Sequence, residues 1–185
     1  MWPWVTGQEC RRFDREQLTA RAAHAHDATI KPATEDLMLH IAKALATQYI
    51  SGKAVTPSKR ELTEFCQWVD RRFERIARYV EFTEEEVSPE RMQGHWEDCA
   101  ILLVSTAHGS HPYWEPATNA RFRAVHDWDH IHSSCGFDFA GETCVAGYAM
   151  ATAPESIRWI IWSEVALQAA ACIVTGKFQP QKLVK

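Results

Sequence analysis

The stretch 155–177 is the strongest constraint on how this chain can fold. It reads ESIRWIIWSEVALQAAACIVTGK and follows Pro154, a residue that favours the start of a helix. Apolar residues fall on nearly every face of such a helix, so it should lie buried at the centre of the protein. No uninterrupted apolar run reaches the roughly 18 to 20 residues of a membrane span. We therefore expect a core helix and no membrane association.

Amphipathic patterns predict further helices around this core helix. They cover residues 34–50, 56–80, 89–99, 118–133 and 141–152. Thr56 can cap the second of them with Pro57 in its first turn, and Thr118 can cap the fourth. The first two helices are expected to pack together as a hairpin.

One segment, 100–106, has the composition of a β-strand. The acidic run 81–87 is expected to be a solvated exit from the preceding helix. The predicted fold is thus mainly α, a bundle of five or six helices with at most a short β-strand pair near 100–106. Residues 1–30 are expected to form an N-terminal arm or marginal helix, and 31–185 a single helical domain.

The net charge, the N-terminal residues and the cysteines indicate which partners and which cellular location to expect. A formal net charge of −4 gives no indication of nucleic-acid binding. The N-terminal residues lack the order of a signal peptide, so a cytoplasmic location is expected. The six cysteines include no C-x-x-C pair. In a reducing compartment they are expected to be buried small apolar residues and not disulfides or zinc ligands.

The string H-D-W-D-H at 126–130 is the main functional signal. Residues four apart share a helix face, so His126 and His130 project together and can hold a divalent metal ion. In the related H-E-x-x-H pattern the carboxylate acts as a general base. Asp127 takes that position here and is a candidate base, a further ligand, or a residue that orients a ligand. Asp129 and His132 point elsewhere, so we expect supporting roles outside the ligand set.

Two imidazoles need a carboxylate from another segment to complete a metal site. Glu142 begins a helix in an apolar stretch, and Glu164 lies within the core helix. A buried carboxylate costs several kcal/mol unless it is protonated, paired or bound to metal. Both glutamates are therefore predicted metal ligands. Gln168, four residues after Glu164, could hydrogen-bond that carboxylate or a ligand.

The order of these motifs resembles a domain of phage and other mobile-element proteins, often found within large polyvalent proteins. The resemblance covers residues 89–185 and rests on 111-HP, 119-N-x-x-F-R-A-V-H-D-x-x-x-H, 137-F-x-x-x-G-E, E-x-x-x-Q at 164–168 and 178-F-x-x-Q-K-L. Similar sequences commonly carry glycine where Asp129 precedes His130. The resemblance implies a mobile-element origin and a shared polar centre, but no reaction. Arg123, one turn before Asp127, is placed to contact a carboxylate or an anionic substrate.

These residues favour a small metal-dependent enzyme, most simply a hydrolase, using zinc, iron or manganese. Its substrate could be a small molecule, a nucleotide or a protein. A non-haem iron or di-iron oxidase is a second hypothesis, because helical bundles build such centres from histidines and carboxylates. The third is a non-enzymatic binding or counter-defence protein with a structural polar centre, in which tryptophans such as Trp2, Trp4 and Trp114 contact a protein partner.

Overall fold

The computed structural model describes residues 31–107 and 109–185, so the predicted arm at 1–30 lies outside the described residues. The described part is mainly helical, with six helices and one two-stranded sheet, which confirms the predicted fold class. The elements are α2 (Lys31–Ser51), α3 (Lys59–Ile76), η1 (Ala77–Tyr79), β1 (Val80–Thr83), α4 (Pro89–Cys99), β2 (Leu102–Ser105), α5 (Pro116–Ser133), α6 (Phe139–Thr152) and a last helix composed of η2 (Glu155–Ile157), α7 (Arg158–Trp162), the π-helical turn η3 (Ser163–Leu167) and α8 (Gln168–Thr175).

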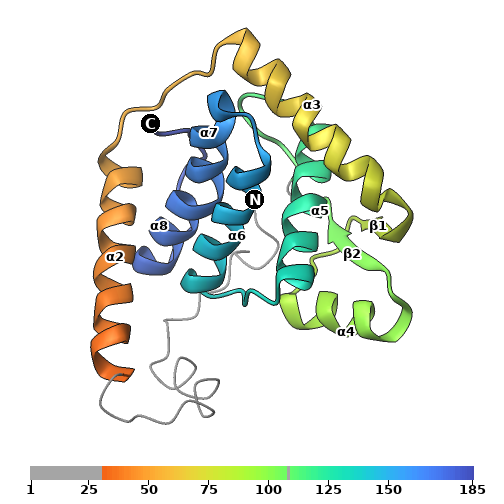
Figure 1. Cartoon of the computed structure of the whole chain (residues 1–185), viewed down its shortest axis with the longest axis horizontal. Helices are drawn as coiled ribbons and strands as arrows, with labels where there is room; N and C mark the ends of the chain where they lie inside the picture. The colour runs from red at the N-terminus through yellow and green to blue at the C-terminus, as the bar shows by residue number, and fades with distance from the viewer. Residues whose placement is uncertain (1–30, 108) are drawn as a thin grey trace.

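The last helix lies in the middle of the molecule, as its apolar composition predicts. It packs against α2 on one side and α6 on the other (Figure 1). Within the described residues, Glu155–Thr175 is the one segment long and apolar enough to span a membrane. Because 72% of its most apolar window is buried inside the protein, its sequence is accounted for by the core.

The two N-terminal helices do not form the predicted hairpin. The helix α2 packs mainly on α8 and α3 packs on α5, with an extended linker between them (Figure 1). The predicted caps also differ. Ser58 and Glu61 form a reciprocal capping box at the start of α3, in place of Thr56. The helix α5 begins at Pro116 after Glu115, two residues before Thr118.

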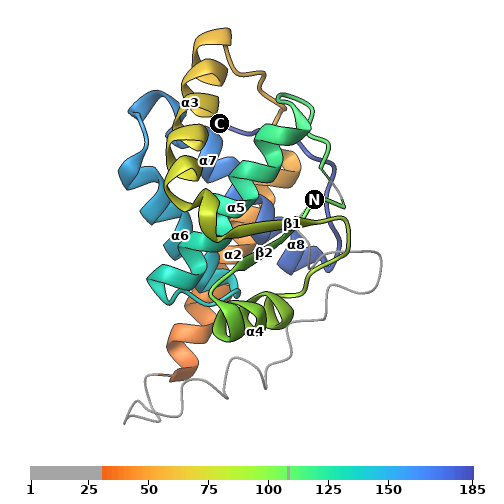
Figure 2. The same cartoon turned by 90° about the vertical axis from the view of Figure 1, so that its right-hand side faces the viewer.

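The acidic run after α3 contains a strand that the sequence pattern does not predict. Strand β1 pairs in parallel with β2, with Val80 opposite Leu102 (Figure 2). All four residues of β2 are buried, and this strand packs against both α4 and α5. The small sheet therefore supports one side of α5, the helix that carries the histidines.

Candidate metal centre

Helix α5 is enclosed on several sides, by α3, β2 and α6. Many of its polar residues are therefore buried, although His132 near its C-terminal end is exposed. The buried polar set is Asn119, Arg123, His126, Asp127, Asp129 and His130. Burial of so many ionisable groups on one helix is costly unless they have partners or bind a ligand.

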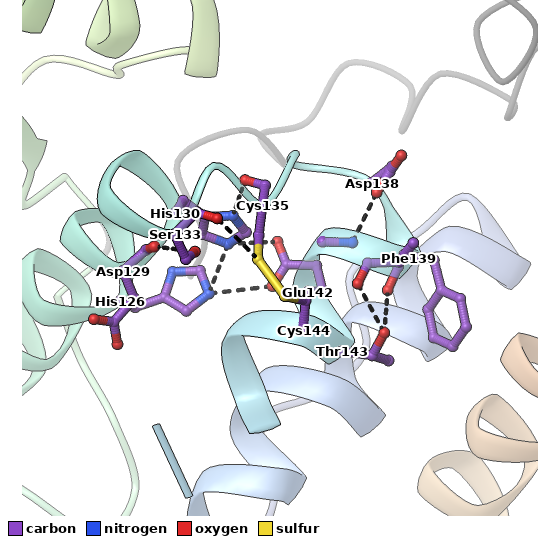
Figure 3. Close-up of a disulfide and its surroundings, with 12 residues drawn as sticks. His126, Asp129, His130, Ser133, Cys135, Asp138, Phe139, Glu142, Thr143 and Cys144 are labelled. Carbon is purple, nitrogen blue, oxygen red and sulfur yellow. Dashed lines mark hydrogen bonds and ion pairs between the residues drawn. A yellow bond between two sulfur atoms is a disulfide. The ribbon is translucent and has the colours of Figure 1, made fainter. Parts of the chain in front are cut away.

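His126, His130 and Glu142 form a buried triad that could hold a metal ion. The Nε2 atoms of the two histidines lie 3.2 Å apart, and the Glu142 carboxylate lies 3.1 Å from the first and 3.5 Å from the second. Figure 3 shows the three side chains converging from α5 and α6. The i, i+4 spacing thus produces the predicted pair of imidazoles, and Glu142 supplies the carboxylate.

The remaining ring nitrogen of each histidine has a partner on the side away from Glu142. Nδ1 of His126 lies 3.2 Å from Oδ1 of Asp127, and Nδ1 of His130 lies 3.2 Å from the carbonyl oxygen of Cys135. An N–H donated from Nδ1 leaves the Nε2 lone pair available to a metal, the arrangement usual for metal-binding histidines. Of the three roles left open for Asp127, its position fits the orientation of a ligand.

Gly141 explains how the loop after α5 reaches the triad. Asp138 caps α6 through a hydrogen bond from the backbone N–H of Gly141. A Cβ atom at Gly141 would lie 1.6 Å from the carbonyl oxygen of Gly136, so any larger residue would displace the loop. This close approach brings the Cys135 carbonyl to His130 and the first turn of α6, with Glu142, to the histidines.

The loop is also joined covalently to α6. Cys135 and Cys144 form a disulfide beside the triad, with Cα atoms 6.4 Å apart (Figure 3). The expectation that the cysteines would all be unpaired apolar residues is wrong for these two. Their pairing depends on the loop that Gly141 admits, and the spacing of cysteines in the sequence does not reveal it.

Electrostatics within the triad favour an ion pair in the absence of metal. Burial lowers the pKa of His126, but the Glu142 and Asp127 carboxylates outweigh burial and raise that pKa to about 9. Burial raises the pKa of Glu142, whereas His126 and His130 outweigh it and lower that pKa to about 2. A metal ion and this proton therefore compete for one place between the same groups.

Glu164 belongs to a different buried contact. Its carboxylate lies 3.3 Å from Nε2 of His111, in the loop before α5, and it does not join the triad. His111 stacks on Trp114, with ring centroids 3.4 Å apart. Glu164 sits in the π-helical turn of the last helix, a local form often found at functional sites. Gln168 donates a hydrogen bond of 3.2 Å to Tyr49 on α2.

The other predicted site residues of α5 lie outside the triad. Asp129 is buried and forms a bidentate ion pair with Arg72 of α3, whose guanidinium group donates hydrogen bonds of 2.6 and 2.8 Å to the two carboxylate oxygens. His132 is exposed and stacks on Trp128, away from the triad. Arg123 is buried, and burial lowers its pKa while the Asp127 charge opposes that effect. Asp129 therefore joins α3 to α5, and His132 belongs to an aromatic surface cluster.

Sequence reasoning missed three participants. His111 and Asn119 appear in the sequence only as members of the motif series. No spacing links His111 to Glu164, whereas the helical spacing of four residues between Asn119 and Arg123 is a signal that could have marked Asn119. The Cys135 carbonyl is a backbone group and has no sequence signal at all.

Comparison of the chain with known proteins yields no further identification. No family model, no curated protein and no solved structure matches it. The geometry of the buried triad is therefore the main basis for a functional proposal.

Proposed function

We propose that this protein is a small metal-dependent hydrolase of phage or mobile-element type, with its metal ion held by His126, His130 and Glu142. The convergence of two Nε2 atoms and one carboxylate within about 3.5 Å carries the proposal. Among the described residues no fourth histidine, cysteine or carboxylate belongs to this group. Catalytic zinc sites use three protein ligands, whereas structural zinc sites use four, so the donor number favours catalysis.

The surrounding groups support this assignment. Asp127 and the Cys135 carbonyl hold the two imidazoles with their Nε2 atoms toward Glu142. Partners of this kind commonly change metal affinity by 10- to 100-fold when removed. A bound metal ion would supply Lewis acidity to polarise the bond that is cleaved. The resemblance of residues 89–185 to a mobile-element domain is consistent with a nucleotide, nucleic-acid or protein substrate.

The same donor set favours one alternative. Two histidines and one carboxylate are also the ligands of mononuclear non-haem iron(II) oxygenases. A di-iron centre requires further bridging carboxylates, and the other predicted glutamate ligand, Glu164, instead contacts His111. The alternative is therefore a mononuclear iron oxidase.

Elemental analysis of the purified chain tests the proposal first. We expect about one equivalent of a transition metal in the wild type, and its loss in His126→Ala and Glu142→Gln. His132→Ala, an exposed histidine on the same helix, is the matched control and should keep the metal. Failure of the wild type to bind zinc, iron or manganese after loading would refute the proposal and favour a structural polar centre.

Activity assays then separate the two enzyme classes. The metal-loaded chain should hydrolyse either model phosphoesters or peptides, with activity lost in His126→Ala and kept in His132→Ala. An iron-loaded sample that consumes oxygen, together with inactivity in both hydrolytic assays, would instead support the oxidase.

A further inference from the structure

Arg123 is a buried charged group without a direct hydrogen-bond partner among the described residues. It is 3% exposed, and none of its three guanidinium nitrogens has a hydrogen-bond partner among those residues. Arg72, by contrast, donates two hydrogen bonds to one carboxylate. Burial of a charge without a partner is strongly unfavourable, so a position of this kind is a candidate for ligand binding.

Asn119, one helical turn before Arg123, adds a second unsatisfied donor. Its Oδ1 accepts a 3.1 Å hydrogen bond from Nε1 of Trp114. Indole nitrogen can only donate, so this bond fixes which end of the amide is oxygen. Its Nδ2 is buried and has no partner within the described residues.

The next hydrogen-bond acceptor along the same face of α5, Asp127, already has a partner. Asp127, one turn after Arg123, contacts Nδ1 of His126. It forms no direct ion pair with Arg123 and acts on it only through its charge. Asn119 and Arg123 thus present donors alone, and the triad begins on the next turn of the helix.

We propose that Asn119 and Arg123 form an oxyanion subsite that binds the phosphate group of a phosphoester substrate beside the metal triad. Guanidinium groups bind phosphate through parallel N–H donors. The two side chains leave α5 about 6 Å apart along its axis, from successive turns. A tetrahedral phosphate can meet donors from two directions and still present an oxygen toward the triad, which a planar carboxylate cannot do. The catalytic meaning of the subsite rests on the proposed hydrolase function, whereas its anion binding does not.

Phosphate binding can be measured separately from metal binding. Inorganic phosphate is titrated into the full chain after treatment with a chelator, and binding is followed by calorimetry and by ³¹P line broadening. Arg123→Met and Asn119→Asp should each weaken phosphate binding at least about tenfold. The first substitution removes the charged guanidinium donors to the anion, and the second removes the neutral amide donor. The aspartate retains the acceptor for Trp114 but offers no donor.

Two controls define the site. Arg121→Met removes a half-buried arginine of the same helix, which pairs with Asp70, and should bind phosphate as the wild type does. Sulfate should compete with phosphate and acetate should not. If Arg123→Met does not fold, Asn119→Asp and Arg123→Lys give the same information, since lysine keeps the charge without the planar fork.

Each outcome decides the inference independently of the metal. Absence of phosphate binding in the wild type, or equal binding in all variants, overturns the subsite. Competition by acetate as strong as that by sulfate overturns the assignment to phosphate. Metal content is measured on the same protein preparations before the chelator is added. If the protein contains metal but does not bind phosphate, the proposed hydrolase function stands and the subsite is refuted. If it binds phosphate but never binds metal, the hydrolase function is refuted and the subsite stands.

Discussion

The substitution Glu142→Gln should lower the pKa of His126 in the metal-free protein, so that His126 loses its proton at a lower pH than in the wild type. The change keeps the size of the side chain and removes the charge that, with Asp127, raises the pKa of His126 from 6.5 to about 9. Burial then dominates, and we expect the pKa to return to 6.5 or lower. The rise seen in the wild type corresponds to about 3 kcal/mol, since one pH unit is equivalent to about 1.4 kcal/mol.

The stability consequence has a definite sign. A folded-state pKa above the unfolded value stabilises the protein below pH 6.5, and this contribution is lost as the pH rises through about 9. Metal-free wild type should therefore lose up to about 3 kcal/mol more than Glu142→Gln between pH 6 and pH 9.5. Urea unfolding in the presence of a chelator measures this difference, and ¹⁵N spectra of the histidine rings report the protonation directly.

Glu97→Gln provides the control, because it removes an exposed carboxylate from α4 and alters the net charge equally. It should unfold with the pH dependence of the wild type. If His126 titrates at the same pH in the wild type and in Glu142→Gln, Glu142 is not its counter-charge, and the electrostatic account of the triad is refuted.

Three further predictions concern metal, packing and redox state. Zinc affinity, measured by chelator competition, should rise about tenfold per pH unit from pH 7 to about 9, because zinc binding displaces the proton held in the triad. A zinc affinity that does not change with pH would contradict this competition between metal and proton. Arg72→Ala should lower the free energy of unfolding by about 3–5 kcal/mol, since it leaves Asp129 buried without its partner. Arg121→Ala, at a pair that is more open to solvent, should change the free energy of unfolding by less than about 1 kcal/mol in denaturant titrations. Reduction of Cys135–Cys144 should weaken zinc binding by about tenfold, because the loop that supplies the carbonyl partner of the second histidine is released; equal affinity in both redox states would show that the loop holds its place without the disulfide.

The local parts of the site could be predicted from sequence, and the long-range parts could not. Helical spacing alone brings His126 and His130 together, since both lie on one helix. The burial argument correctly marks Glu142 and Glu164 as carboxylates in an apolar environment, but it cannot tell which of them faces the histidines. That choice depends on how α6 packs against α5 and how the last helix packs against α6.

The same limit explains the errors in the fold. Strand β1 has exposed Glu81 and Phe82, and only its pairing with β2, about twenty residues later, makes it a strand. Its own pattern resembles a solvated segment. The helix α2 packs on α8 of the last helix and α3 packs on α5, and the amphipathic patterns of two consecutive helices do not specify these partners.

The unpaired donors of Arg123 imply that function and stability oppose each other at this position. Replacing the arginine with methionine keeps most of the side-chain volume and removes a buried charge that has no direct partner within residues 31–107 and 109–185. Replacements of buried charges by apolar residues of similar volume are often stabilising, by about 1–4 kcal/mol. In phosphate-free buffer Arg123→Met should therefore melt several degrees above the wild type, since about 1 kcal/mol shifts the melting temperature of a chain of this size by about 2–4 °C. A lower melting temperature would show instead that the arginine stabilises the buried Asp127 carboxylate through its charge, and that a structural role alone accounts for its burial.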